Sequence, residues 1–217
     1  MIYAINYENV HHFGLLFPQI FRLRYREFIE RQSYDVRSYQ EMEYDQYDTP
    51  AACYLTYADP AGKVVAASRL TPTTQGCMLR DIWPHLVEDK NLLQSDDVWE
   101  GTRYCIDKNV SSADRQRIIH EMAIAYLEFG LQKGLRRIIG MMPTYIYRRV
   151  FERPGIEMEY LGPVQQIGRH NIRAVAIPVE KAQLERVREK TGLNGRILKG
   201  FKATATHEYE VSHARAA

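Results

Sequence analysis

The sequence predicts an α/β fold in which a mixed sheet carries helices on both of its faces. Two strand-like segments, 52–57 and 63–70, flank the turn-forming residues Asp59-Pro60-Ala61-Gly62 and predict an antiparallel hairpin. Later strand-like segments alternate with helical ones, and this order covers a sheet from both sides. The chain has 217 residues, which is enough for one domain with a sizeable core, so we expect a single domain over 1–217.

The first third of the chain predicts a strand, a helix and a loop around this hairpin. Residues 1–6 read as a short strand, and residues 33–50 are polar, acidic and without a period, as in a loop. A helix is expected over 13–31, with its start or a kink near Pro18. The apolar residues that recur there at three- to five-residue steps are Phe13, Phe17, Ile20, Leu23 and Phe28.

Strands and helices alternate from residue 98 onward. Segment 98–106 predicts a strand, and Ser111 or Ser112 can cap a long helix that ends near Gly134. Segment 137–142 is an apolar run typical of a central strand. The long helix should turn one apolar stripe to the core, made of Ile119, Met122, Ala123, Tyr126 and Phe129.

The last elements complete the predicted sheet and its cover. Thr144 can cap a helix over 145–153, which Pro154 and Gly155 would end. Segment 172–177 predicts a strand and 180–190 a helix. Because apolar residues become sparse after Thr191, we expect 191–217 to be a peripheral extension.

Composition excludes several classes of protein. Hydrophobic residues make up 45% and charged residues 26%, as in a soluble domain, and the net charge of +2 is too small to indicate nucleic-acid binding. No apolar run is long enough for a membrane-spanning helix, and residues 1–6 lack the basic start of a signal peptide. Cys53, Cys77 and Cys105 are far apart and no histidine cluster accompanies them. We therefore expect a cytoplasmic protein with free thiols and no metal site.

Charged residues recur beside aromatic ones at fixed places in segments that otherwise read as core elements. Arginine and carboxylate side chains are expensive to bury unless they meet each other or a charged ligand, so these residues are expected to form a site. The residues of this series are Arg24, Phe28, Tyr34, the run 43–48 with Asp45 and Asp48, Arg69 in the stretch Arg69-Leu70-Thr71-Pro72-Thr73, and Glu100 and Arg103 in the run 99–104.

This series resembles the LuxI-type acyl-homoserine lactone synthases over roughly residues 3–180. Seven of the eight family positions agree by residue type, and the departure is Tyr34, where the family usually has tryptophan. The resemblance implies a three-layer α-β-α sandwich around a mixed, splayed sheet, similar to the GCN5-related N-acyltransferases. It also implies two substrates, S-adenosylmethionine and an acyl thioester on coenzyme A or acyl carrier protein, and no metal or redox cofactor. The product would be an N-acyl-L-homoserine lactone, a quorum-sensing signal, with methylthioadenosine released.

The resemblance places catalysis at Glu100, Arg69 and Arg103. The attacking amine must lose a proton, and Glu100 is the candidate base; alternatively Glu100 only pairs with one of the two arginines. In a regular strand Glu100 and Arg103 point to opposite faces, because their separation is odd. If both line one site, we expect a bulge or splay around Gly101-Thr102.

Five residues are candidates for binding S-adenosylmethionine, namely Arg24, Phe28, Tyr34, Asp45 and Asp48. Arg24 would bind its carboxylate or hold an aspartate. Phe28 and Tyr34 would wall the adenine or the sulfonium, because an aromatic face attracts a cation. Asp45 and Asp48 would attract the sulfonium and amine, or form structural ion pairs with the arginines.

The acyl chain requires an apolar slot, and the docking of its carrier requires positive charge. The candidates for the slot are Met141, Met142, Tyr145 and Ile146, with Leu79 as a further candidate; each also fits ordinary core. Several bulky side chains there favour a short or branched acyl group. Positive charge for the carrier gathers at Arg136, Arg137, Arg148, Arg149 and Arg153, which alternatively form a solvated helix face.

Two other functions fit parts of this pattern. A general N-acetyltransferase using acetyl-CoA typically has a glycine-rich loop before the long helix, and residues 107–112 contain no glycine. The second is a non-catalytic module that binds S-adenosylmethionine, or another partner, without turnover. The glycine-rich turn of the common methyltransferases after the first strand is also absent.

Overall fold

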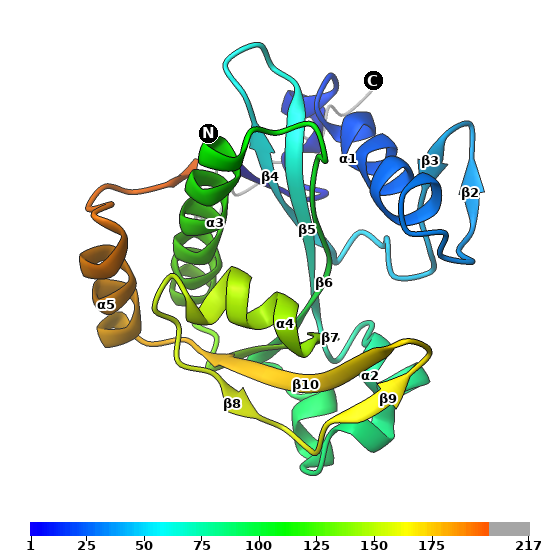
Figure 1. Cartoon of the computed structure of the whole chain (residues 1–217), viewed down its shortest axis with the longest axis vertical. Helices are drawn as coiled ribbons and strands as arrows, with labels where there is room; N and C mark the ends of the chain where they lie inside the picture. Colours follow the sequence, from blue (N-terminus) through cyan, green and yellow to red (C-terminus); the bar gives the residue numbers. More distant parts are fainter. Residues whose placement is uncertain (200–217) are drawn as a thin grey trace, which may run out of the picture.

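The computed structural model describes residues 1–199, which build a nine-stranded mixed sheet covered by helices on both faces (Figure 1). The strands lie in the order β11-β1-β4-β5-β6-β7-β10-β8, with β9 beside β10. Pairs β1–β11 and β6–β7 are parallel and the others are antiparallel. Their bounds are β1 Ile2–Ile5, β4 Cys53–Ala58, β5 Val64–Pro72, β6 Val98–Ile106, β7 Arg137–Pro143, β8 Glu159–Tyr160, β9 Gln165–Ile167, β10 His170–Pro178 and β11 Leu198–Lys199.

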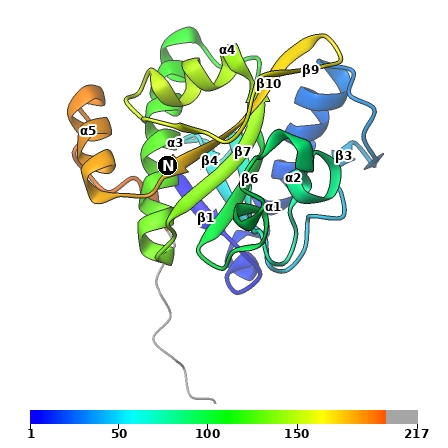
Figure 2. The same cartoon turned by 90° about the horizontal axis from the view of Figure 1, so that it is seen from below.

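The helices form the two outer layers, as predicted. Figure 2 shows α3 and α5 on one side of the sheet and α1 and α2 on the other. Alternation along β4 explains the layering, because Leu55 packs in the cluster of α3 while Tyr54 packs in the cluster of α1. The helices are α1 Phe17–Arg24, α2 Met78–Ile82, α3 Ser112–Lys133, α4 Thr144–Tyr147 and α5 Lys181–Thr191. Wider π-helical turns, Tyr25–Glu30 and Arg148–Glu152, continue α1 and α4, and short 3-10 turns lie at Val10–Phe13, Pro84–Leu86 and Lys90–Gln94.

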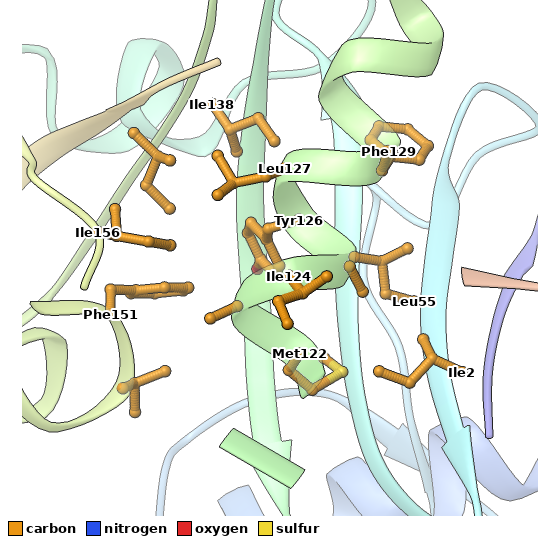
Figure 3. Close-up of a cluster of buried hydrophobic side chains, with 14 of the residues drawn as sticks. Ile2, Leu55, Met122, Ile124, Tyr126, Leu127, Phe129, Ile138, Phe151 and Ile156 are labelled. Carbon is orange, nitrogen blue, oxygen red and sulfur yellow. The ribbon is translucent and has the colours of Figure 1, made fainter. Parts of the chain in front are cut away.

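Helix α3 is the central element of the core. Its N-terminus is capped by the Ser111 side chain, which accepts the N–H of Asp114, and it ends at Gly134 with φ of 67°. All five residues of its predicted stripe are buried. Figure 3 shows Ile2 and Leu55 of the sheet on one side of α3, and Phe151 and Ile156 on its other side. The helix is therefore packed between the sheet and the segment that follows α4.

Strand β6 departs from regular pairing on both of its edges. Its parallel pairing with β7 covers only Val98, Trp99 and Glu100, so the two strands splay apart from Gly101 onward. On the β5 side the register shifts between Ala67 and Arg69, which leaves Arg103 and Tyr104 as a bulge opposite Ser68. The predicted splay at Gly101 is thus confirmed, whereas the bulge lies one to two residues later than Gly101-Thr102.

Other local predictions differ from the structure in detail. Helix α1 begins beside Pro18 as expected, and 33–50 contains a small hairpin of β2 (Ser38–Tyr39) and β3 (Met42–Glu43) within the predicted loop. Thr144 does not cap α4: β7 extends to Pro143, so Thr144 is already the first helical residue and no side chain caps that end.

The C-terminal extension contributes to the sheet before the described residues end. Leu198 is fully buried, and β11 pairs with β1 at the edge of the sheet. The carboxylate of Glu128 accepts the main-chain N–H groups of Ile197 and Leu198, which fixes this strand on α3. The remainder of the predicted peripheral extension, 200–217, lies outside the described residues.

Within residues 1–199 no helix has both the length and the apolar character needed to cross a membrane.

Substitution of Gly140 tests the close approach of β7 to β6 at the splay. A Cβ at residue 140 would lie 2.8 Å from the main-chain oxygen of Gly101, so Gly140→Ala forces the strands apart. We expect a loss of roughly 1–3 kcal/mol in the free energy of unfolding, measured by urea denaturation. Gly14→Ala is the control: nothing lies within 4 Å of a Cβ there, and the change should stay within about 0.5 kcal/mol. Equal effects of the two substitutions would contradict the close contact.

Candidate active site

Three arginines and three carboxylates form a closed ring of alternating charges, which we call the ion-pair ring. Each member contacts two partners of opposite sign, so the formal charges of the six side chains cancel. In order around the ring, the shortest N–O distances are Arg24–Glu43 2.6 Å, Glu43–Arg103 3.1 Å, Arg103–Asp45 2.7 Å, Asp45–Arg69 2.5 Å, Arg69–Asp48 2.9 Å and Asp48–Arg24 2.7 Å.

The ring joins elements that are far apart in the sequence. Arg24 is the last residue of α1, Glu43 lies in β3, and Arg69 and Arg103 project from β5 and from the bulge of β6. Arg103 has φ of +54°, a left-handed conformation that costs of order 1–3 kcal/mol for a residue with a side chain. The ion pairs of Arg103 offset this strain, and the bulge turns its guanidinium toward Glu43.

Because the ring is buried, each of its charges depends on its partners of opposite sign. Arg24, Arg69 and Glu43 are almost inaccessible to solvent, so each needs its partners. Aromatic rings add cover: Arg24 lies over Phe21, Arg69 over Tyr47 and Arg103 over Phe28, with distances to the ring centroids of 5.2, 5.7 and 5.8 Å.

Asp48 shows the electrostatic effect of the ring. Burial alone would raise the pKa of the Asp48 carboxyl, but the hydrogen bonds and charge of Arg24, with the charge of Arg69, hold that pKa well below its usual range. The hydroxyl of Tyr54 donates a further hydrogen bond to Asp48 at 2.8 Å. The carboxylate therefore stays ionised and fully engaged.

These contacts favour structural ion pairs, rather than ligand binding, for Arg24 and Asp48. Arg24 donates from all three guanidinium nitrogens, to Glu43 and Asp48, which leaves it no donor edge for a substrate carboxylate. Glu43 is a ring member to which the residue spacing assigns no role. The feature of the sequence that could have indicated Glu43 is its position in the same acidic run as Asp45 and Asp48.

A cavity of about 1000 Å³ lies beside the ring and extends along the splay between β6 and β7. Its walls also include the loop 32–37 and the hairpin of β9 and β10. The predicted site residues that line it are Phe28, Tyr34, Asp45, Glu100, Arg103, Met141, Met142, Tyr145 and Ile146. Arg24, Arg69, Asp48 and Leu79 do not line it. The rings of Phe28 and Tyr34 stack with centroids 5.9 Å apart and planes within 10°, so two parallel aromatic rings form part of the cavity wall.

Glu100 is held at the inner side of this cavity and is only 1% exposed. Its two oxygens accept the main-chain N–H groups of Met78 and Leu79, at 2.6 and 2.8 Å, in the first turn of α2. Burial raises the pKa of Glu100 to about 7, although the two amides and the charge of Arg69 act in the opposite direction. In the described part of the chain Glu100 forms no ion pair with Arg69 or Arg103, so the alternative in which it only pairs with them is wrong.

Some residues that line the cavity are not among the site residues predicted from the sequence. Thr102 accepts a hydrogen bond from Arg69 Nε at 3.0 Å, and Tyr126 shares a 2.5 Å hydrogen bond with Ser68. Tyr126 belongs to the predicted core stripe, and helical period alone cannot tell a core tyrosine from one at a cavity wall. Trp83 and Tyr104 line the cavity as well.

A second cavity, of about 510 Å³, lies on the α1 side of the ring and shares Asp45 with the first. Its wall contains aromatic residues such as Phe17, Phe21 and Tyr44. Glu100 and Arg103 line only the larger of these two cavities.

The predicted cluster of arginines for the carrier divides into two sets. Arg136 pairs with Asp97 and Arg137 with Glu159, so both have partners. Arg148, Arg149 and Arg153 are exposed, and within residues 1–199 they form no ion pair. In the same described part of the chain, no group of three or more histidine, cysteine, aspartate or glutamate residues is arranged to hold a metal ion.

The chain belongs to the autoinducer synthase family, whose model matches residues 10–187. The acyl-homoserine-lactone synthase of Aeromonas salmonicida is 30% identical over 162 residues, 73% of this chain and 77% of that protein. The isovaleryl-homoserine lactone synthase of Bradyrhizobium diazoefficiens is 26% identical and covers 89% of this chain and 86% of its own length. The solved structure of BjaI, a CoA-dependent acyl-homoserine lactone synthase with SAM and isopentyl-CoA, is 27% identical, with a TM-score of 0.81 and 92% of both chains covered.

These comparisons confirm the predicted LuxI-type family and acyltransferase class. The fold is also shared more widely: FeeM, an N-acyl amino acid synthase from uncultured soil microbes, superimposes with a TM-score of 0.56 at 12% identity. The predicted N-acyltransferase fold is therefore confirmed as well.

Removal of one charge from the ring is expected to destabilise the fold strongly. Asp48→Asn leaves Arg24 and Arg69 buried without their shared partner, so we expect a loss of roughly 3–5 kcal/mol in the free energy of unfolding at pH 7. Folding lowers the pKa of Asp48, so its contribution is complete above its unfolded pKa of about 3.9 and is lost as the pH falls below that value. The difference between the two proteins should therefore narrow in acid.

Asp97→Asn is the matched control, because Asp97 pairs with Arg136 at the surface. An exposed pair contributes at most about 1 kcal/mol, so urea denaturation should show a small loss. A loss for Asp48→Asn as small as that of the control would contradict the importance of the ring.

Proposed function

We propose that this protein synthesises an N-acyl-L-homoserine lactone, a quorum-sensing signal, from S-adenosylmethionine and an acyl thioester, in the cytoplasm. The observation that carries the proposal is a buried carboxylate with a pKa near 7, Glu100, in a cavity walled by the ion-pair ring and by the splayed strands. Family membership and the binding of SAM and isopentyl-CoA by BjaI support the choice of substrates. S-adenosylmethionine is consumed, so it is a substrate and no separate cofactor is involved.

S-adenosylmethionine would bind at the ring end of the cavity. The stacked rings of Phe28 and Tyr34 offer a face to the adenine or to the sulfonium. Asp45 also lines the cavity, and its carboxylate, although paired with Arg69 and Arg103, would offer its exposed part to the sulfonium and the amine. Arg24 and Asp48 act from behind, because their charges hold the other ring members in place.

The first chemical step is formation of the amide. The α-amino group has an ordinary pKa of about 7.7–8.0, and Glu100 takes its proton, directly or through a water molecule, so that the nitrogen can attack the thioester carbon. Main-chain N–H groups freed by the splay of β6 from β7 are suited to stabilise the oxyanion of the tetrahedral intermediate. The carbon–sulfur bond of the thioester then breaks, and the carrier leaves as its thiol.

The second step closes the lactone. A carboxylate oxygen of the methionine part attacks the carbon beside its own sulfonium, and the carbon–sulfur bond breaks toward sulfur. The negative carboxylate and the positive sulfonium are both neutralised, and methylthioadenosine departs. The protein's task here is to hold the chain bent, which the aromatic rings of Phe28 and Tyr34 can do by fixing the leaving group.

The acyl group would occupy the apolar end of the cavity. Met141, Met142, Tyr145 and Ile146 line the cavity together with other bulky residues such as Trp83, and this favours a short or branched acyl group. Arg148, Arg149 and Arg153 would draw the phosphates of coenzyme A or an acidic carrier protein. We favour acyl-CoA, because the CoA-dependent BjaI matches 92% of this chain.

Product analysis tests the function directly. Purified protein is incubated with S-adenosylmethionine and a panel of acyl-CoA and acyl-carrier-protein thioesters, and the mixture is examined by mass spectrometry. We expect an N-acyl homoserine lactone together with methylthioadenosine, formed fastest from a short or branched acyl-CoA. Thioester consumption without lactone would indicate a general N-acetyltransferase. Binding of S-adenosylmethionine with no consumption would indicate the non-catalytic module.

The pH dependence of turnover tests Glu100 as the base. The base acts only when ionised, so kcat/KM should rise with pH through an apparent pKa of about 7. Glu100→Gln should lower kcat/KM by about 10²–10⁴-fold and remove that rise. Glu88→Gln, at an exposed glutamate, is the control and should keep the wild-type profile. A folded Glu100→Gln protein with full turnover across this pH range would show that Glu100 is not the base.

A further inference from the structure

Met78 contacts both the ion-pair ring and Glu100. Its main-chain N–H donates to Glu100 at 2.6 Å, and its thioether sulfur accepts from Arg69 Nη2 at 3.5 Å and from Arg103 Nη1 at 3.7 Å. The side chain is 9% exposed and lines the large cavity. One residue therefore joins the two parts of the site.

Two guanidinium nitrogens donate to the Met78 sulfur, and one of them also donates to a carboxylate of the ring. Arg69 gives Nη1 to Asp45 and Nε to Thr102, and its Nη2 lies closer to Asp45 at 3.2 Å than to the sulfur. Arg103 directs Nε to Glu43 and Nη2 to Asp45, which leaves Nη1 for the sulfur. A thioether is a weak acceptor, so it can orient these groups without competing with the carboxylates.

Helix α2 depends on such contacts for its position. It has only five residues, too few to be stable without tertiary support. Its first turn is tied to Glu100 by Met78 and Leu79 and to the preceding residue by the Cys77 sulfur, which accepts the Arg80 N–H at 3.4 Å. The Met78 side chain is the link from this turn to the arginines of the ring.

We propose that Met78 is a positioning residue, which keeps Glu100 in register with the ion-pair ring by binding the carboxylate through its main chain and Arg69 and Arg103 through its sulfur. The inference rests on the proposed function, in which Glu100 is the base. Without the sulfur, the first turn of α2 shifts relative to Arg69 and Arg103, and the Met78–Glu100 hydrogen bond weakens. That bond favours the ionised form of Glu100, so its loss moves the protonation of Glu100 to higher pH.

The other charged and titratable side chains around Glu100 are not mutated in this experiment. They are Arg69 on β5, Asp81 on α2, Cys77 before α2, and Tyr47. A movement of the pH profile on changing Met78 alone then reports on the position of the first turn of α2 relative to Glu100.

Two substitutions of Met78 distinguish the effect of its side-chain volume from the effect of its sulfur as a hydrogen-bond acceptor. Met78→Leu keeps a similar volume, a kind of exchange that cores tolerate, but removes the acceptor. Met78→Gln restores an acceptor, because its amide oxygen can face the two guanidinium groups. Met122→Leu is the matched control, since Met122 is fully buried in the core of α3, away from the cavity. Each protein is assayed for lactone formation against pH, with the thioester that the wild type uses best, and for stability in urea.

We expect Met78→Leu to lower kcat by roughly 10-fold, less than the roughly 100-fold that a 1 Å misplacement can cause, and to move the acidic limb of the profile to higher pH. Met78→Gln should recover the wild-type profile, and Met122→Leu should keep it. If Met78→Leu does not fold, the pH profile of Met78→Gln decides. An acidic limb at the same pH as in the wild type supports the proposal, and an acidic limb at higher pH overturns it.

A folded Met78→Leu protein with the wild-type profile would overturn the inference while leaving the proposed function intact. Equal losses of stability in both Met78 variants, with no movement of the pH limb, would also overturn it, because Met78 would then serve packing alone. If the wild type itself forms no lactone from any thioester, the proposed function fails, and the inference fails with it.

Discussion

The burial of charge at the ion-pair ring is the constraint on which the rest of the structure depends. Arg24, Arg69 and Glu43 are removed from water, and a buried charge is tolerated only when partners of opposite sign are placed within a few ångströms. The three arginines come from α1, β5 and the bulge of β6, whereas the three carboxylates come from the single run 43–48. The ring can therefore close only when these elements are all in position. Closure of the ring therefore couples the α1 layer to the sheet and gives the cavity one rigid wall.

The ring and Glu100 show two opposite uses of a buried carboxylate. Asp48 is surrounded by arginines, which hold its pKa low, so its charge is constant across the working range of pH. Glu100 receives main-chain N–H groups instead of ion pairs, and burial then brings its pKa to about 7, where it can both release and accept a proton. The difference lies in the partners and not in the residue type, because Asp48 and Glu100 are both carboxylic acids.

The splayed sheet provides the space that this chemistry needs. The parallel pairing of β6 with β7 stops at Glu100, and beyond it the strands diverge around the close contact of Gly140 with Gly101. The cavity follows this divergence, and its lining combines charged residues such as Arg103 with apolar ones such as Met141 and Ile146. A cavity with both charged and apolar walls thus follows from one interruption of strand pairing.

Local sequence patterns determined most of the fold. The hairpin of β4 and β5, the caps of α3 at Ser111 and Gly134, and the central strand β7 follow from turn residues, capping residues and apolar period, which act over a few residues. The spacing of Arg24, Asp45, Arg69, Glu100 and Arg103 also indicated the family, and it named most of the side chains that the structure gathers in the ion-pair ring and the large cavity. Only the tertiary structure decided which charge meets which: it gave Glu43 a place in the ring, moved the bulge to Arg103, and joined Glu100 to amides rather than to arginines. Ion-pair partners are chosen by distances across the folded chain, and no local pattern carries that information.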